Sequence, residues 1–147
     1  MFTHILVPTD GSAAAQRAAA AGIRLAAATG ARVSGFFAAP PATPIVFENF
    51  LPSGYRPPDE HAQIIERMAA RYLGAIGRLA AKAGVPYEGV HVTSDFPAEA
   101  ILAVAKRRRC DLICMAPHAR SRIATALLGS QTQKVLAQAT IPVLVVR

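Results

Sequence analysis

Two short segments place polar side chains and glycine directly after apolar runs of the chain. The first is Pro8-Thr9-Asp10-Gly11-Ser12, which follows Ile5-Leu6-Val7. An ionised carboxylate accepts hydrogen bonds and donates none, so Asp10 suits groups that donate them, such as a ribose hydroxyl or an adenine amino group. Aspartate is also a frequent N-cap residue, so Asp10 could instead cap a helix that follows. Both roles of Asp10 are open, and both can hold together.

The second segment is Met115-Ala116-Pro117-His118-Ala119-Arg120-Ser121, with Gly129 and Ser130 further along the chain. Ser130-Gln131-Thr132-Gln133 has the S-x-x-Q spacing of a capping box, which predicts that Ser130 starts the last helix. A helix N-terminus presents backbone N–H groups that bind anions. Because glycine precedes this N-terminus and both Arg120 and Arg122 are expected to serve it, the segment is also a candidate phosphate site.

The elements around these segments must position them. Strand-like apolar runs alternate with helix-like segments, which predicts a parallel sheet with crossover helices in one domain over residues 1–147. Ligands of such sheets bind beyond the carboxyl ends of the strands, where both segments fall. The expected strands are 3–9, Arg32–Ala39, Tyr87–Thr93, 111–115 and 141–146; the expected helices are 12–29, 60–83, one that starts after Pro97, and Ser130–Gln138.

The stretch over residues 40–59 differs from the rest of the chain. It holds six of the eleven prolines together with several aromatic residues. Proline lacks a backbone N–H, so this stretch is predicted to form neither a regular helix nor a central strand. Long loops in compact domains often cover a site, and disorder is the alternative interpretation.

Composition limits the function classes. No apolar run approaches the length of a membrane span, and the first residues lack the pattern of a secretory signal, so we expect a cytoplasmic protein with no membrane partner. Cys110 and Cys114 are not spaced as C-x-x-C and the four histidines are scattered, which disfavours a zinc site. We expect both cysteines to lie in the core.

The net charge of +7 and the pI near 10.3 raise the question of nucleic-acid binding. The one dense basic run is Lys106-Arg107-Arg108-Arg109, at the end of a predicted helix. Cations there complement the helix dipole. No interleaved aromatic residues or RNA-binding signature accompany them, so nucleic acid is not expected as a partner.

Three stretches of the sequence, taken in order, resemble the universal stress protein family: ILVPTDGS, DLICMAPHARS and GSQTQKVLAQATIPVLVVR. The resemblance covers essentially the whole chain. It implies an α/β fold with three layers, Rossmann-like and similar to the adenine nucleotide alpha hydrolases, around a five-stranded parallel sheet of order 3-2-1-4-5. It also implies a homodimer formed through the last strand and, in one branch of the family, ATP bound with Mg²⁺ at the carboxyl edge.

The nucleotide-binding branch carries the pattern G-x2-G-x9-G-[ST], and this chain reads Ala116-x2-Ala119-x9-Gly129-Ser130. The last pair matches, whereas alanine replaces the first two glycines. If either position needs a positive φ, alanine costs about 1–2 kcal/mol there, so ATP binding is an open question. The nucleotide-binding residues that the resemblance implies are Pro8, Asp10, Ala38, Met115, Ala116, His118, Ala119, Arg120, Gly129, Ser130 and Gln131.

Rival functions have weaker patterns. The chain has no G-x4-G-K-[ST] loop, no G-x-S-x-G turn and no H-x-G-H element, so at most slow ATP hydrolysis is expected, with His118 as its acid or base. A phosphorelay receiver would need more acidic residues than Asp10 and Asp95, together with a late lysine.

A pure interaction protein is the stronger alternative. The segment Ile141-Pro142-Val143-Leu144-Val145-Val146 is apolar throughout, and an apolar sheet edge has to be covered by a partner strand. We therefore expect a homodimer through this segment, with an unidentified further protein partner if the pocket is empty.

Overall fold

A five-stranded parallel sheet forms the centre of the computed structural model, which describes residues 1–42, 57–117 and 128–147. The sheet order is β3-β2-β1-β4-β5, as expected. Its strands are β1 (His4–Pro8), β2 (Arg32–Ala39), β3 (Tyr87–Thr93), β4 (Leu112–Met115) and β5 (Val143–Val145).

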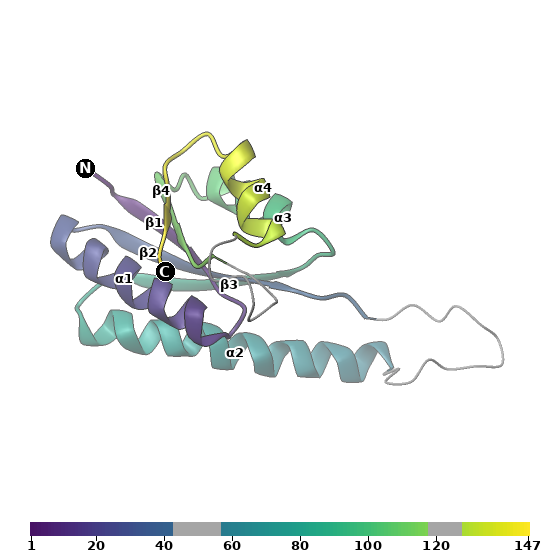
Figure 1. The fold of residues 1–147 in the computed structure, drawn as a ribbon. Coiled ribbons are helices and arrows are strands. Elements are labelled where there is room, and N and C mark those ends of the chain that lie inside the picture. Colours follow the sequence, from purple (N-terminus) through teal and green to yellow (C-terminus); the bar gives the residue numbers. More distant parts are fainter. Residues whose placement is uncertain (43–56, 118–127) are drawn as a thin grey trace.

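In the described parts of the chain, four helices cover the two faces of this sheet and make the expected three layers (Figure 1). On one face lie α1 (Ala13–Thr29) and α2 (Pro58–Lys82); on the other lie α3 (Pro97–Arg107) and α4 (Ser130–Gln138). Because each crossover helix runs back to the amino edge of the sheet, the carboxyl ends of the strands and the N-termini of the helices lie at one edge.

Burial on both faces explains why the central strands read as continuous apolar runs. Ile5 and Val7 pack into the core beneath α1 and α2, whereas Leu6 between them packs against α3 and α4. All three side chains are fully buried. Each contributes about 1.5–3 kcal/mol of hydrophobic stabilisation, so the strand nearest the predicted site is rigidly held.

The alanine and glycine content of α1 lets this helix approach the sheet closely. A Cβ atom on Gly22 would lie 3.0 Å from Val7 Cγ2 and 3.4 Å from Cys114 Sγ. Cys110 and Cys114 are both buried, as predicted, and neither forms a disulfide. The described residues contain no cluster of three potential metal ligands.

The ends of several elements differ from the sequence prediction. Helix α2 begins at Pro58 rather than at residue 60, because proline fits the first helical turn, where its missing N–H has no partner to lose. Strand β5 is shorter than predicted, since it begins only after Pro142. Ile141 and Val146, predicted as the first and last residues of this strand, lie outside it; Ile141 packs against the core on the α3 and α4 side, and Val146 against the core on the α1 and α2 side. The predicted loop over residues 40–59 lies mostly in 43–56, outside the described residues.

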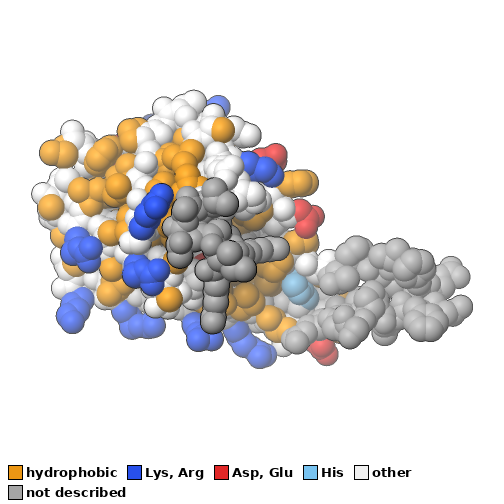
Figure 2. Space-filling view, in the orientation of Figure 1, with side chains coloured by type: hydrophobic (Ala, Val, Ile, Leu, Met, Phe, Trp, Pro, Cys, Tyr) orange, Lys and Arg blue, Asp and Glu red, His pale blue; other side chains and the backbone are white. Residues whose placement is uncertain are grey.

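The positive charge of the molecule is distributed over several elements. Figure 2 shows Lys and Arg side chains separated by uncharged and hydrophobic ones on the side where α1 and α2 lie. Exposed arginines on these helices are Arg17, Arg24, Arg67, Arg71 and Arg78. The dense run at residues 106–109 ends α3, as predicted from the sequence. No helix in the described parts of the chain combines the length and the apolar character that a membrane span requires.

Candidate functional site

The carboxyl edge of the sheet carries the first predicted segment and the described part of the second, residues 115–117. Strand β1 pairs in parallel with β2 on one side and with β4 on the other, so the loops after β1 and β4 leave the sheet at the same edge. Pro8 ends β1 and Met115 ends β4. Ala38, near the end of β2, is half-buried and packs against the core cluster that contains Met115.

The turn after β1 has a defined shape. Gly11 N–H donates to Thr9 Oγ1 over 3.1 Å, and Ser12 N–H donates to Asp10 Oδ1 over 2.9 Å. Gly11 has a φ of 81°, which favours glycine. Asp10 is exposed at the tip of this turn, beyond the end of β1.

Ser12, rather than Asp10, caps α1. The Ser12 side chain accepts a hydrogen bond from Ala15 N–H over 3.1 Å. The interpretation of Asp10 as the helix cap was therefore wrong, because Asp10 lies two residues too early and its Oδ1 binds the amide of the cap residue itself. The role of Asp10 in ligand binding stays a prediction.

Tyr72 of α2 is a neighbour of this turn that the sequence analysis missed. A Cβ atom on Gly11 would lie only 2.3 Å from Tyr72 Cε1. The Tyr72 ring also packs edge-on against Phe37, with ring centroids 5.2 Å apart. Tyr72 therefore fixes the turn that carries Asp10 against the α2 side of the molecule, a contact across more than sixty residues that no local pattern could reveal.

Helix α4 begins at Ser130, as predicted, but its cap differs from the prediction. The N-cap is Gly129, in an extended conformation, and no side chain caps the helix. Gln133 N–H donates to Gly129 O over 3.0 Å, and the Gln133 side chain donates to Leu128 O over 2.7 Å. The capping box was therefore wrong, because Ser130 lies inside the first turn. The first backbone N–H groups of α4 have no carbonyl partner within the helix.

Two side chains of the first α4 turn fix the helix in place. Gln131 Oε1 accepts from Ala98 N–H at the start of α3 over 3.1 Å. Thr132 Oγ1 donates to Ala116 O over 3.2 Å and is fully buried. The side chain of Gln131 thus faces α3, so a phosphate at this helix would meet the backbone N–H of residue 131.

Ala116 has an ordinary backbone conformation. Arg109 is the only non-glycine residue with a positive φ in the described parts of the chain, so Ala116 does not adopt the left-handed conformation that would favour glycine. The Ala116 side chain is almost buried. The strain cost considered from the sequence therefore does not arise at this position. His118, Ala119 and Arg120 lie outside the described residues.

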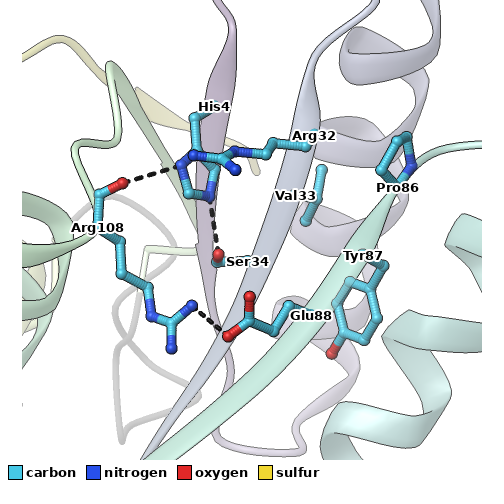
Figure 3. A pocket seen from close by; sticks show the side chains of 8 residues that line it. All are labelled: His4, Arg32, Val33, Ser34, Pro86, Tyr87, Glu88 and Arg108. Atoms are coloured by element: carbon cyan, nitrogen blue, oxygen red, sulfur yellow. Dashed lines mark hydrogen bonds and ion pairs between the residues drawn. The ribbon is translucent and has the colours of Figure 1, made fainter.

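Sequence patterns also missed a pocket at the opposite, amino edge of the sheet. It lies among the first residues of three strands and the end of α3, with His4, Arg32 and Arg108 in its wall (Figure 3). The residues that line it come from four distant parts of the chain: His4, 32–34, 86–88 and Arg108. The pocket is separate from the predicted nucleotide site, because the two lie at opposite ends of the strands.

Comparisons with known proteins agree on the family. The sequence matches the Universal stress protein family over residues 1–147. It is 37% identical, over 100% of both chains, to the Thermus aquaticus protein named "Universal stress protein in QAH/OAS sulfhydrylase 3'region".

Solved structures share the fold. A universal stress protein in complex with cAMP is 26% identical, with a TM-score of 0.71, and the match covers 99% of this chain and 97% of that one. The universal stress protein from Archaeoglobus fulgidus in complex with dAMP is 19% identical, with a TM-score of 0.68 over 99% and 98% of the two chains. From its sequence and its fold, this chain belongs to the universal stress protein family.

Proposed function

We propose that this protein is a stress-response module that binds an adenine nucleotide, with MgATP as the expected ligand, at the carboxyl edge of its sheet. The observation that carries the proposal is the start of α4, where Gly129 is the N-cap and no side chain occupies the capping position. Such a helix start can accept a phosphate on its backbone N–H groups. The relative that was solved with cAMP supports an adenine nucleotide as the ligand class.

The residues of this edge have complementary roles in the proposal. Asp10 accepts hydrogen bonds from the ribose or the base, and Pro8 holds its turn at the end of β1. Ala38, half-buried near the end of β2, contacts the base, and the backbone at Met115 contacts the nucleotide. Gly129 and the backbone N–H groups of Ser130 and Gln131 bind phosphates, assisted by His118 and Arg120 and by the backbone at Ala119.

Alanine at position 116 is compatible with this role. Its backbone needs no positive φ, and its carbonyl is already oriented by Thr132. The methyl group that alanine has and glycine lacks is almost completely buried, so little of it is exposed where a ligand would bind. The departure from the glycine pattern at this residue therefore supplies no reason against nucleotide binding.

A second candidate function is a homodimer that acts through protein partners. Strand β5 forms hydrogen bonds with β4 and is the last strand in the sheet order. Leu144 on this edge strand is 41% exposed, and Leu136 on α4 is 40% exposed. Large apolar side chains on an edge strand favour pairing with a second chain, so Ile141 to Val146 is the proposed dimer segment.

Calorimetry of the purified protein with MgATP tests the nucleotide proposal, with ADP, AMP and cAMP as further ligands. We expect Gly129→Asp to abolish binding, because a carboxylate at the helix N-terminus repels phosphate. The matched control is Gly74→Asp, which adds the same charge in the middle of α2, where a new Cβ meets only Arg78 at 3.6 Å. Binding in the control and none in Gly129→Asp is the expected result.

The opposite results separate the two candidates. If none of the four nucleotides produces heat or a thermal shift, the nucleotide proposal is wrong. The second candidate, a homodimer that acts through protein partners without a bound nucleotide, then remains. If Gly129→Asp binds as well as the control, a nucleotide binds elsewhere and the assignment of the phosphate site to α4 is wrong.

A further inference from the structure

Helices α1 and α2 pack side by side on one face of the sheet, and their outer sides face solvent (Figure 1). Four basic residues lie on the outer side of α2, and all four are exposed: Arg67, Arg71, Arg78 and Lys82. At about 100° of rotation per residue, they fall within about 60° of one another. The buried residues of α2 lie about 180° away around the same helix. The four cations therefore form one row that points away from the sheet.

Helix α1 carries a second row. Arg17 and Arg24 are exposed and lie opposite the buried residues of this helix. They are seven residues apart, or about 10 Å along the axis, as are Arg71 and Arg78 on α2. Both helices end at the amino edge, where they lead into the neighbouring strands β2 and β3. Counted back from these ends, Arg24 lies level with Arg78, and Arg17 lies level with Arg71.

The two rows make up a basic face without acidic residues. Residues 13–29 and 67–82 contain no aspartate or glutamate. The nearest acid along α2 is Glu66, and its carboxylate lies 3.3 Å from His91 Nε2 of β3. None of the six cations forms an ion pair with another residue in the described parts of the chain. Figure 2 shows Lys and Arg side chains along this side of the molecule. A surface of one sign attracts partners of the opposite charge.

The uncharged residues of the basic face favour a nucleic acid over a folded protein or a membrane. Protein interfaces centre on buried aromatic and aliphatic side chains, and helices that lie on membranes insert large apolar ones. On α1 and α2, both of which the structure describes in full, Leu79 is the only large apolar side chain that is exposed. Most of the other exposed uncharged residues are alanine. Binding to nucleic-acid phosphates needs only cations.

We propose that the basic face binds the phosphate backbone of duplex DNA without reading its sequence. Packed helices have axes about 8–10 Å apart, and the major groove of B-DNA is about 12 Å wide. Arginine side chains are long, so the α1 row and the α2 row can contact the two strands that flank one groove. The α2 row is about 22 Å long, which corresponds to about six base-pair steps.

The side-chain chemistry of the basic face agrees with this partner. Five of its six cations are arginines. A guanidinium group donates two parallel hydrogen bonds to a pair of phosphate oxygens, whereas an ammonium group acts as a point charge. The face lies on the outer side of α1 and α2, away from the carboxyl edge of the sheet, so this proposal is independent of nucleotide binding.

The folded helices change the expectation from the sequence that nucleic acid is not a partner. Along the sequence only the run at residues 106–109 is dense in cations. The cations of the basic face are four or seven residues apart on each helix, so they gather only when the helices form. The two rows come together only when α1 and α2 pack on the same face of the sheet.

Fluorescence anisotropy of a labelled DNA duplex, measured with the purified protein over a range of salt concentrations, tests the proposal. The logarithm of the association constant should fall with the logarithm of salt concentration, with a slope of about −3.5 to −5.5 for four to six phosphate contacts. The double variant Arg71→Gln with Arg78→Gln should reduce the size of this slope by about 2. At low salt the same variant should bind about tenfold or more weakly.

The matched control is Lys106→Gln with Arg107→Gln. It removes the same charge from exposed residues in the last turn of α3, on the other face of the sheet. We expect its salt slope to equal that of the native protein, and both double variants to keep their nucleotide affinity. Equal losses of DNA binding in the two double variants would mean that net charge alone attracts DNA, and the proposal would be wrong.

Two further results overturn the proposal. One is the absence of any anisotropy change with the duplex at the lowest salt concentration. The other is tighter binding to polyglutamate, or to vesicles that contain phosphatidylserine, which is lost in Arg71→Gln with Arg78→Gln. That result would assign the basic face to an acidic protein or to a membrane surface instead of DNA.

Discussion

The side chain of Gln131, in the first turn of α4, accepts a hydrogen bond from the backbone N–H of Ala98 in the first turn of α3. The N-cap of α3 is Phe96, which offers no side-chain acceptor. Gln131 therefore supplies the cap that α3 lacks in its own sequence. This contact fixes the two helix N-termini relative to each other at the proposed phosphate-binding edge.

Gln131→Ala should lower the free energy of unfolding by about 1–2 kcal/mol, because Ala98 N–H loses its partner in a buried turn. Nucleotide affinity should change little, since the backbone N–H of residue 131 remains. Urea denaturation and calorimetry measure the two effects. Gln133→Ala is the control: its hydrogen bond to Leu128 O is exposed, so we expect a loss of less than about 0.5 kcal/mol. A large loss of affinity in Gln131→Ala alone would show that the side chain itself binds ligand.

Gly11→Ala should destabilise the turn that carries Asp10 for two reasons. The residue has a φ of 81°, and a Cβ atom would collide with the Tyr72 ring. Gly30→Ala is a matched control, because Gly30 has a φ of 71° and open space around its Cβ position. The control should lose about 1–2 kcal/mol of unfolding free energy from strain alone, and Gly11→Ala should lose more.

The double variant Gly11→Ala with Tyr72→Ala separates the collision from the strain. Added to Tyr72→Ala, the Gly11 change should cost no more than the Gly30 control does. Equal losses for Gly11→Ala and Gly30→Ala in the native background would mean that the Tyr72 ring moves aside freely.

His4 should make the protein less stable below neutral pH. Burial and Arg32 lower its pKa in the folded state below 6.5, the value of the unfolded chain, so the unfolded chain binds more protons between the two values. The stability from neutral His4 is complete above about pH 6.5 and is lost as the pH falls through that window.

Comparison with His4→Gln isolates this effect, because the other histidines are common to both proteins. The stability advantage of the native protein over the variant, from urea denaturation, should shrink from about pH 8 to about pH 5.5. Asp111 is partly desolvated, but hydrogen bonds from His4 and Thr3 outweigh this and hold its pKa below the usual range. A constant difference across the range would show that His4 does not titrate differently on folding.

Leu144→Asp should convert the proposed dimer into monomers. Leu144 is exposed on edge strand β5, and pairing with a second chain would bury it. A charge there costs several kcal/mol in a packed interface. Light scattering measures the molar mass. Leu79→Asp is the control, because Leu79 is 39% exposed on α2, far in the fold from β5. A dimer that persists in Leu144→Asp would place the interface elsewhere.

Local patterns predicted most of the fold. The bounds of β2, β3 and α4 agree with the structure, because apolar runs, glycine and proline act over a few residues. The errors lie at caps and ends, such as Ser12 in place of Asp10 and Gly129 in place of Ser130. Aspartate, serine and glycine are all frequent N-cap residues, so neighbouring residues of these types compete for the position, and the backbone geometry of the folded chain decides among them.

By itself, the sequence determined the alternation of strands and helices, the family resemblance and the two polar segments that follow the first and fourth strands. Only the tertiary structure decided that Tyr72 packs on Gly11, that Gln131 caps α3, and that His4 meets Ser34 and the end of α3 in a second pocket. The physical reason is range: secondary structure follows from neighbours along the chain, whereas these contacts join residues that only the crossovers of a parallel sheet bring together.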